Sequence, residues 1–128
     1  DYVFIVNTDT AIHKDTISQI VDVLESDSNI GIVGSTTWEY TEPLKAQNSG
    51  GYYNPSETIY KWYTETTNPS RSSVKYVDVD FVFGSAMCIR RVMAEQIGLF
   101  NSDYFGYFED VFWNIIKEMG CATKGIIR

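Results

Sequence analysis

The opening residues 2–34 constrain the fold most, because their hydrophobic pattern predicts a strand, a helix and a second strand in succession. Residues 2–6 are an unbroken apolar run of β-branched and aromatic side chains, which is typical of a strand buried on both faces. Residues 15–27 predict a helix that begins at Asp15 as its N-cap and has one apolar face, at Ile17, Ile20, Val21 and Leu24. Residues 30–34 are a second apolar run, so the sheet is expected to be at least partly parallel.

Residues 35–73 differ from this opening unit, because they are weakly periodic and rich in Thr, Ser, Asn, Gly, Pro and Tyr. Turns are expected at 48–51 and 54–55, where Asn, Ser, Gly and Pro cluster. A long insertion of this kind is usually functional or mobile. Its aromatic side chains either stack on a ligand such as the face of a sugar or pack the insertion onto the sheet: Trp38, Tyr40, Tyr52, Tyr53, Tyr60, Trp62 and Tyr63.

The remaining segments also indicate strands and helices. Residues 74–90 are β-rich, and the Gly84-Ser85-Ala86 step that interrupts them marks either the close approach of a ligand or a bulge without one. The other expected elements are a helix at 92–97 ended by Gly98, a helix with an apolar face at 108–119 ended by Gly120, and a strand at 123–127.

Composition and charge narrow the classes of partner. The chain has 128 residues, 44% of them hydrophobic, which fits a single globular domain at 1–128. Its formal charge is −7 and it has no cluster of Lys and Arg, which argues against nucleic acid as a partner. An anionic ligand would need a metal ion or a helix N-terminus to offset the repulsion. No apolar run approaches the roughly 18 residues of a transmembrane helix, so no transmembrane segment is expected.

Two further features concern the setting of the chain. Cys88 and Cys121 lie far apart in apolar surroundings, so we expect two buried, reduced thiols and a reducing compartment. The chain begins and ends on strand-like segments, which indicates a piece of something larger.

Three places carry candidate functional side chains. Asp9 follows the first strand, where an α/β sheet binds ligands, and a carboxylate there either holds a hard cation or caps a turn. Glu109 and Asp110 belong to the first turn of the last helix, where carboxylates are favourable for dipole reasons alone. His13 is the sole histidine and is interpreted as a solvated surface residue.

Taken in order, these segments resemble the family 2 glycosyltransferases of GT-A fold, especially the bacterial rhamnosyltransferase-like members. The resemblance runs from Asp1 to about Met119 and rests on an ordered set of short motifs, none of them decisive alone. They are NTDT at 7–10, IGIVG at 30–34, SGG at 49–51, VDFVFGSAMCIRR at 79–91, IGLF at 97–100 and YFEDV at 107–111.

The resemblance implies a Rossmann-like nucleotide-diphospho-sugar transferase fold, with a mixed, mostly parallel sheet flanked by helices. Residues 1–128 would be the central and C-terminal part of the catalytic domain. The N-terminal half of the family's domain, which binds the nucleotide base, is absent, and so is a C-terminal segment that often carries a metal-binding His. We therefore expect the fragment alone to be inactive and its open sheet edges to favour a homodimer.

For the site, the resemblance implies that Asp9 binds Mg²⁺ or Mn²⁺ bridging the donor diphosphate and that Asn7 contacts the donor. Asp110 aligns with the catalytic base, and Glu109 is expected to position the acceptor. Gly84 and Ser85 would line the pocket near the donor sugar. The segment 112–117 departs from the Asp-Leu and Arg-containing helix that the family often has, which leaves the acceptor open.

The function that follows from the resemblance is inverting transfer of a sugar, as in a hexosyltransferase, from a nucleotide-sugar to a saccharide or lipid-linked acceptor. Cell-envelope polysaccharide synthesis is the usual setting, so we expect a cytoplasmic protein, peripheral at the inner face of the membrane at full length. A haloacid-dehalogenase-type phosphatase is disfavoured, because its nucleophilic Asp would be Asn7. A catalytically silent glycan-binding module on the same fold remains an alternative, as does a scaffold domain for protein contacts.

Overall fold

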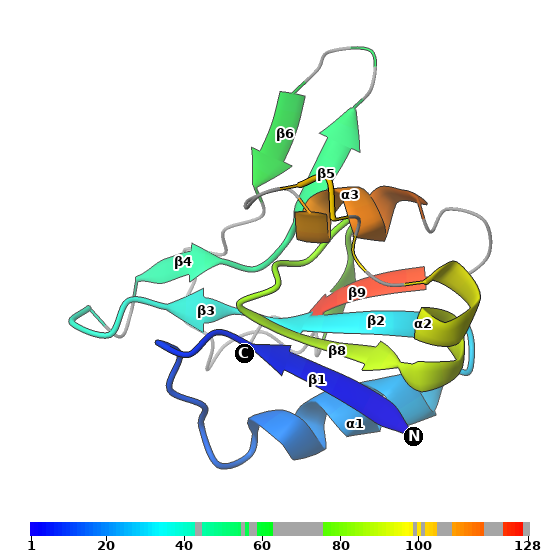
Figure 1. Ribbon diagram of the computed structural model, residues 1–128. Helices are drawn as coiled ribbons and strands as arrows, with labels where there is room; N and C mark the ends of the chain where they lie inside the picture. Colours follow the sequence, from blue (N-terminus) through cyan, green and yellow to red (C-terminus); the bar gives the residue numbers. More distant parts are fainter. Residues whose placement is uncertain are drawn as a thin grey trace.

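Five strands form the main sheet of the computed structural model, which describes residues 1–42, 45–54, 56, 59–62, 76–98, 100, 102–104, 109–116 and 122–126. Their spatial order is β1 (Tyr2–Val6), β8 (Ala86–Arg90), β2 (Ile30–Ser35), β9 (Ala122–Ile126) and β7 (Tyr76–Asp78) (Figure 1). The mixed α/β class expected from the sequence is confirmed.

The expectation of a mostly parallel sheet is wrong. Among the described strands, β8 is antiparallel to both β1 and β2, and β9 is antiparallel to β7, while β2 and β9 form a parallel pair. Strands β1 and β2 do run in the same direction with α1 (Thr16–Ser26) between them in the sequence. They are not neighbours, however, because β8 is inserted between them. An apolar run reads the same in either direction, so the sequence pattern did not reveal this insertion.

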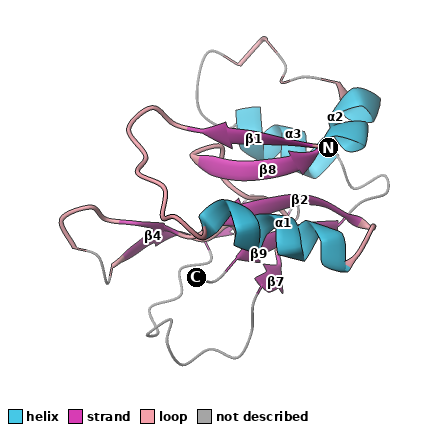
Figure 2. Cartoon of the chain, turned by 90° about the horizontal axis from the view of Figure 1, so that it is seen from below, coloured by secondary structure: helices cyan, strands magenta, loops and turns pink. Residues whose placement is uncertain are grey.

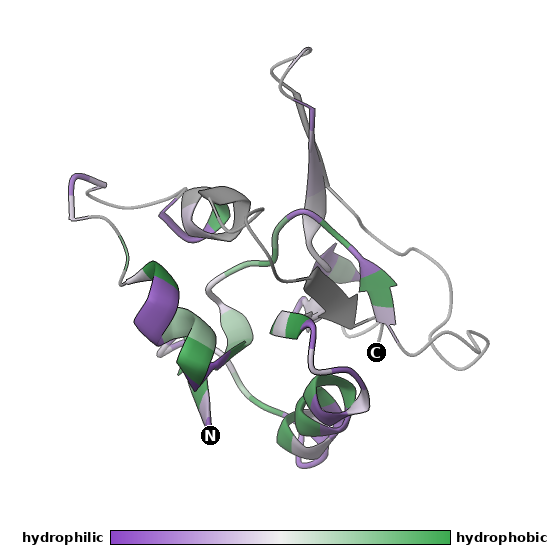
Figure 3. Cartoon of the chain, turned by 90° about the vertical axis from the view of Figure 1, so that its right-hand side faces the viewer, coloured by the Kyte–Doolittle hydropathy of each residue, from purple (hydrophilic) through white to green (hydrophobic). Residues whose placement is uncertain are grey.

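Helices cover both faces of this sheet. Helix α1 packs its apolar side chains against one face, in a cluster made up of Ile20, Val23, Leu24, Ile30, Val33 and Cys88. Helices α2 (Arg91–Ile97) and α3 (Glu109–Ile116) contribute Met93 and Trp113 to a second cluster, with Ile32, Val79, Val82, Met87 and Ile89. Figures 1 and 2 show α1 on the opposite side of the sheet from α3. Helix α1, the lowest helix in Figure 3, carries both hydrophobic and hydrophilic residues. Ile20, Val23 and Leu24 are its buried side chains, whereas Ile17, which the sequence placed on the apolar face, is 53% exposed because it lies in the first turn.

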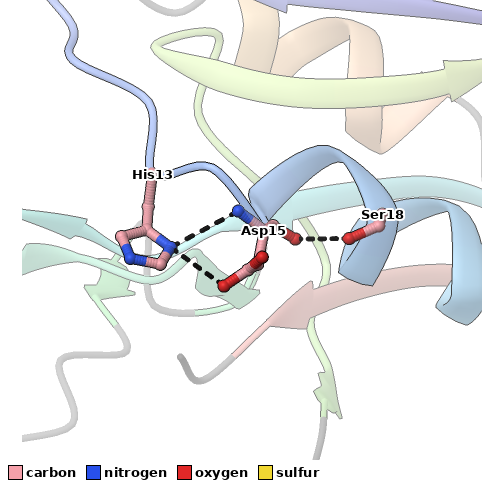
Figure 4. A network of polar contacts seen from close by, with 3 residues as sticks. All are labelled: His13, Asp15 and Ser18. Atoms are coloured by element: carbon pink, nitrogen blue, oxygen red, sulfur yellow. Dashed lines mark hydrogen bonds and ion pairs between the residues drawn. The ribbon is translucent and has the colours of Figure 1, made fainter.

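The predicted helix ends agree with the structure where it describes them. Asp15 is the N-cap residue of α1, but its carboxylate makes no capping hydrogen bond and lies 3.6 Å from His13 Nδ1 instead (Figure 4). Gly98 ends α2 with a φ of 91°, and its N–H donates to the Ala94 carbonyl. The expected end of α3 at 119–120 lies outside the described residues. Within the described ranges, no helix is long and apolar enough to cross a bilayer.

Strand β1 is more exposed than the sequence predicted. Val3 and Val6 are 43% and 38% exposed, so the expectation of a strand buried on both faces is wrong for β1. The reason is its place in the sheet: among the described strands β1 has one neighbour, β8. The second apolar run behaves as expected, since Ile30, Ile32 and Val33 of β2 are fully buried.

The insertion at 35–73 contains two short antiparallel pairs that the sequence did not predict. They are β3 (Thr37–Trp38) with β4 (Ala46–Asn48), and β5 (Gly51–Asn54) with β6 (Ile59–Trp62). Gly50 has a φ of 112° between β4 and β5, but the backbone at 49–50 forms neither a turn nor a bend, so the turn expected at 48–51 is wrong. Long-range bonds place β5: the Asp80 carboxylate accepts the Tyr53 N–H at 2.8 Å, and the Tyr52 hydroxyl donates to the Asp78 carbonyl at 2.9 Å.

The aromatic side chains of this insertion were expected either to stack on a ligand or to pack the insertion onto the sheet, and packing accounts for only some of them. Trp38 and Tyr53 are partly buried, in agreement with packing. Tyr40 is 91% exposed and Tyr52 is 40% exposed, so packing does not account for these two rings. Tyr63 lies outside the described residues, as do the side chains of Tyr60 and Trp62.

Arg90, the last residue of β8, ties the sheet to α1. Its guanidinium donates to the Leu24 carbonyl at 2.6 Å and to the Ile30 carbonyl at 3.1 Å, and it lies over the Tyr2 ring at 5.4 Å. Leu24 belongs to the last turn of α1, where a cation is favoured by the helix dipole. One side chain therefore connects β1, β8, β2 and α1.

We expect Arg90→Met to lower the free energy of unfolding by about 2–3 kcal/mol, because two carbonyl oxygens lose a charged donor. Arg91→Met is the matched control. Arg91 is the next residue, its side chain is 58% exposed and it pairs with Glu95, so its loss should cost less than about 1 kcal/mol. Urea unfolding monitored by circular dichroism measures both. Equal effects of the two substitutions would contradict the role assigned to Arg90.

Cys88 is a free, buried thiol, as expected, while Cys121 lies outside the described residues. Burial raises the pKa of Cys88 above its ordinary value. The stability that the neutral thiol contributes is therefore fully present below the pKa of the unfolded chain, about 8.5, and is lost as the pH rises through the folded pKa. In a Cys121→Ser background, the free energy of unfolding should fall more between pH 8 and pH 10 than in Cys88→Ala. Parallel pH profiles for the two proteins would contradict this.

Candidate functional site

The segment Asn7–Asp9 follows β1 directly, at the carboxyl end of that strand, and is exposed. The Asn7 N–H donates to the Ser85 carbonyl at 3.1 Å, and the Thr10 N–H donates to the Asn7 carbonyl at 3.1 Å, which closes a turn. Ligands of α/β sheets bind at such strand ends. The predicted position of these residues is therefore confirmed.

Gly84 and Ser85 lie beside this turn because β8 runs against β1. The first residue of β8, Ala86, pairs with Val6 at the end of β1, so the chain enters β8 next to Asn7. The sequence left open whether the Gly-Ser-Ala step marks a bulge or a close approach. Gly84 lies in a turn before the strand rather than within it, and its N–H donates to Asp110 Oδ2 at 2.7 Å, while the approach of a ligand stays a prediction.

The space around Gly84 limits the size of the side chain that this position can hold. A Cβ added to Gly84 would lie 3.4 Å from Asp110 Oδ2 and 3.5 Å from Asp110 Cβ. That distance is an ordinary contact, so glycine is not required for folding at this position. A side chain longer than one carbon would, however, compete with the Asp110 carboxylate for the same space.

Asp110, in the first turn of α3, makes one local and one long-range hydrogen bond. Its Oδ1 accepts the Val111 N–H at 2.7 Å, which is a local contact at the helix start. Its Oδ2 accepts the Gly84 N–H, which is a contact over a separation of 26 residues. Helix α3 is held in place by the Trp113 indole, which donates to the Gly98 carbonyl at 3.0 Å. The start of α3 is thereby fixed against the sheet edge.

Two polar atoms at this edge are buried and have no hydrogen-bond partner. They are Glu109 Oε2 and Ser85 Oγ, one beside Asp110 and the other beside Gly84. A buried polar atom without a partner costs free energy, so each is expected to have a reason. A ligand that bonds to both atoms is such a reason.

The metal-ligating potential of the site is limited to single carboxylates. Within the described part of the chain, no group of three or more His, Cys, Asp and Glu side chains is arranged to hold a metal ion. Asp9 is exposed and makes no hydrogen bond or ion pair with the other described residues. Mg²⁺ commonly uses one or two carboxylates together with waters and substrate phosphates, so one carboxylate fits a metal that arrives with a phosphate ligand.

The structure brings five of the six predicted site residues into one connected group. A backbone hydrogen bond joins Asn7 to Ser85, the Gly84 N–H donates to the Asp110 carboxylate, and Glu109 adjoins Asp110 in the chain. Asp9 lies two residues from Asn7 in the exposed turn. His13 is exposed, as expected, and its imidazole contacts Asp15 rather than this group.

Sequence reasoning missed a set of polar side chains near this edge, in Thr36, Thr37, Asn48 and Ser49. Thr36 Oγ1 and Ser49 Oγ lie 2.8 Å apart, and both residues are buried. Only the pairing of β3 with β4 brings these residues together. The Asn, Ser and Gly residues at 48–51 mark the break between β4 and β5, but nothing in the sequence indicated which strand would be the partner.

Comparison with known proteins adds no constraint, since no protein-family model and no curated protein sequence matches the chain.

Proposed function

We propose that the chain belongs to an inverting glycosyltransferase of GT-A fold, which transfers a sugar from a nucleotide-diphosphate donor to a hydroxyl acceptor. The observation that carries the proposal is the pair of hydrogen bonds, one between backbone groups and one from a backbone N–H to a carboxylate, that joins the three resembling motifs at one sheet edge. The Asn7 N–H bonds to the Ser85 carbonyl, and the Gly84 N–H bonds to the Asp110 carboxylate. Segments 7–9, 84–85 and 109–110 are far apart in the sequence, so a chance resemblance gives no reason for them to meet.

In the proposed reaction, the acceptor hydroxyl oxygen forms a bond to the anomeric carbon while the bond from that carbon to the diphosphate oxygen breaks. The electron pair of the broken bond leaves with the nucleoside diphosphate, and the hydroxyl proton passes to Asp110. Each oxygen of this carboxylate already accepts one backbone N–H. Attack from the side opposite the leaving group inverts the configuration at the anomeric carbon.

The neighbouring residues would bind and orient the substrates. The orphaned Glu109 Oε2 is an acceptor for a second substrate hydroxyl, and the orphaned Ser85 Oγ is a donor or acceptor on the donor side. Asp9 would hold a divalent cation together with the diphosphate, and Asn7 would contact the donor. The cation supplies positive charge for the departing diphosphate, which an acidic chain of formal charge −7 does not supply itself.

The second candidate function is a glycan-binding module without catalysis. It is favoured by the exposed ring of Tyr40 and by the orphaned polar atoms, which a saccharide could satisfy without any reaction. It assigns no role to the exposed carboxylate of Asp9. Nucleotide binding therefore separates the two candidates. Because the resemblance covers only part of a catalytic domain, the experiments below use the intact protein.

We expect Asp9→Ala to abolish Mn²⁺-dependent binding of UDP or dTDP, because the cation loses its protein carboxylate. Calorimetric titration of each nucleotide, with and without Mn²⁺, measures this. Asp22→Ala is the control, since Asp22 is an exposed carboxylate on α1, away from the sheet edge. If the unmodified intact protein binds no nucleotide under any metal condition, the transferase proposal is wrong and the glycan-binding module is favoured.

We expect Asp110→Asn to lower kcat by about 10²- to 10⁴-fold, the range for loss of a general base. The amide has one acceptor oxygen for the two backbone N–H groups that the carboxylate now accepts, so a structural effect must be excluded. Thermal unfolding and the Kd for UDP with Mn²⁺ serve that purpose and should change little.

Glu109→Gln is the matched comparison from the same helical turn. We expect it to raise the KM for the acceptor more than it lowers kcat, because Glu109 is assigned to positioning. A larger loss of kcat in Glu109→Gln than in Asp110→Asn would reverse the two roles.

A further inference from the structure

The hairpin formed by β3 and β4 carries two facing residues that each have a buried side-chain oxygen without a hydrogen-bond partner among the described residues. Thr37 and Asn48 lie directly opposite each other in the antiparallel pairing. Directly opposite side chains share a face of the hairpin and are close neighbours. Nevertheless, Thr37 Oγ1 and Asn48 Oδ1 are both buried and make no hydrogen bond.

The neighbouring pair on the same hairpin shows the contrast. One residue closer to the sheet, Thr36 Oγ1 and Ser49 Oγ are 2.8 Å apart and satisfy each other, at exposures of 7% and 2%. Hydroxyl groups at this hairpin thus pair where a partner is within reach. The outer pair needs a third group between Thr37 and Asn48.

The hairpin lies at the same sheet edge as the candidate site. It continues β2 beyond its carboxyl end, which points in the same direction as the carboxyl end of β1 (Figure 1). The Ser35 hydroxyl donates to the Ala86 carbonyl at 3.4 Å, and Ala86 follows Ser85 directly. Asn7, Ser85 and Thr36 therefore lie on successive strands or their extensions, and the outer segments are separated by about two strand spacings, roughly 10 Å.

The chemistry of the hairpin favours a neutral, hydroxyl-bearing ligand. Asn48 Oδ1 is an acceptor, and the Thr37 hydroxyl donates and accepts, so one ligand hydroxyl satisfies both. The Lys45 ammonium lies 3.6 Å from the Glu42 carboxylate and 4.0 Å from the Glu39 carboxylate, so among the described residues of the hairpin no cation remains unpaired for an anionic ligand.

The hairpin also offers an apolar surface and a way to reach the buried oxygens. The tip carries the Tyr40 ring, 91% exposed, against which the C–H face of a sugar can pack. Thr37 and Asn48 are partly exposed as whole residues, so a change of side-chain rotamer brings their oxygens to the surface.

We propose that the β3–β4 hairpin is a saccharide subsite in which Thr37 and Asn48 bind one hydroxyl of a neutral sugar. Its identification as the acceptor subsite rests on the proposed transferase function. The proposal that the ligand is a saccharide does not rest on that function, because a glycan-binding module would also use Thr37 and Asn48 to bind a sugar. The simplest competing occupant is a structural water, which would satisfy the same two oxygens.

Binding of a panel of neutral p-nitrophenyl glycosides to the intact protein, measured by saturation-transfer NMR with titration, tests the proposal. Thr37→Val keeps the shape and β-branching of the side chain and removes the hydroxyl. We expect it to weaken glycoside binding about 3- to 10-fold, the equivalent of one hydrogen bond. Thr37→Ser retains the hydroxyl and should bind within about twofold of the unmodified protein. Thr41→Val, which removes an exposed hydroxyl at the hairpin tip, is the matched control and should have no effect.

Asn48→Leu provides a second variant if Thr37→Val does not fold by circular dichroism, and the same weakening is expected. Unchanged affinity in the folded variant would overturn the proposal and assign the pair to a structural water. Absence of glycoside binding to the unmodified protein would also overturn it. Titration of UDP with Mn²⁺ in the same samples keeps the two proposals separate. Glycoside binding that depends on Thr37, without nucleotide binding, would support the subsite and reject the transferase.

Discussion

The direction of β8 is the constraint on which the candidate site depends. Because β8 runs against β1 and β2, the residues that enter it lie at the carboxyl ends of those two strands. Gly84 and Ser85 are therefore next to Asn7, and Asp110 reaches them from α3. A parallel β8 would place Gly84 and Ser85 at the opposite edge of the sheet and Arg90 beside Asn7. The antiparallel placement of β8 between β1 and β2, which makes the expectation of a mostly parallel sheet wrong, thus brings the predicted site residues together.

The two ends of β8 have different functions in the architecture. At its start, the turn that contains Gly84 leaves room for the Asp110 carboxylate, and the Gly84 N–H donates to that carboxylate. At its end, Arg90 bonds to carbonyls of α1 and β2 and covers the ring of Tyr2. The end fixes the strand in the layered core, so the start can carry unpaired polar groups such as Ser85 Oγ. An unsatisfied polar atom is tolerated at one end because the rest of the strand is well packed.

The sequence predicted elements better than it predicted their arrangement. The strand at 2–6, the helix that follows Asp15 and the glycine after α2 depend on local chemistry, and these elements are confirmed, although Ile17 of the predicted apolar face is exposed. The pairing of β3 with β4 and of β5 with β6 depends on remote partners, such as the Asp80 carboxylate that accepts the Tyr53 N–H. No periodicity within 35–73 indicates those partners. For the same reason the exposure of β1 was missed, because it depends on which strands lie beside it.

For the site, the sequence supplied the residues but not the link between them. Local physics alone assigns Asp110 to the start of a helix, and its contact with the Val111 N–H agrees with that. The contact with Gly84 is what distinguishes it from an ordinary helix-start carboxylate, and only the tertiary structure contains that contact. The helix-start contact and the contact with Gly84 are compatible, because each uses a different oxygen of one side chain. A carboxylate held at both oxygens has a fixed orientation, which the proposed role as a base would require more than freedom to move.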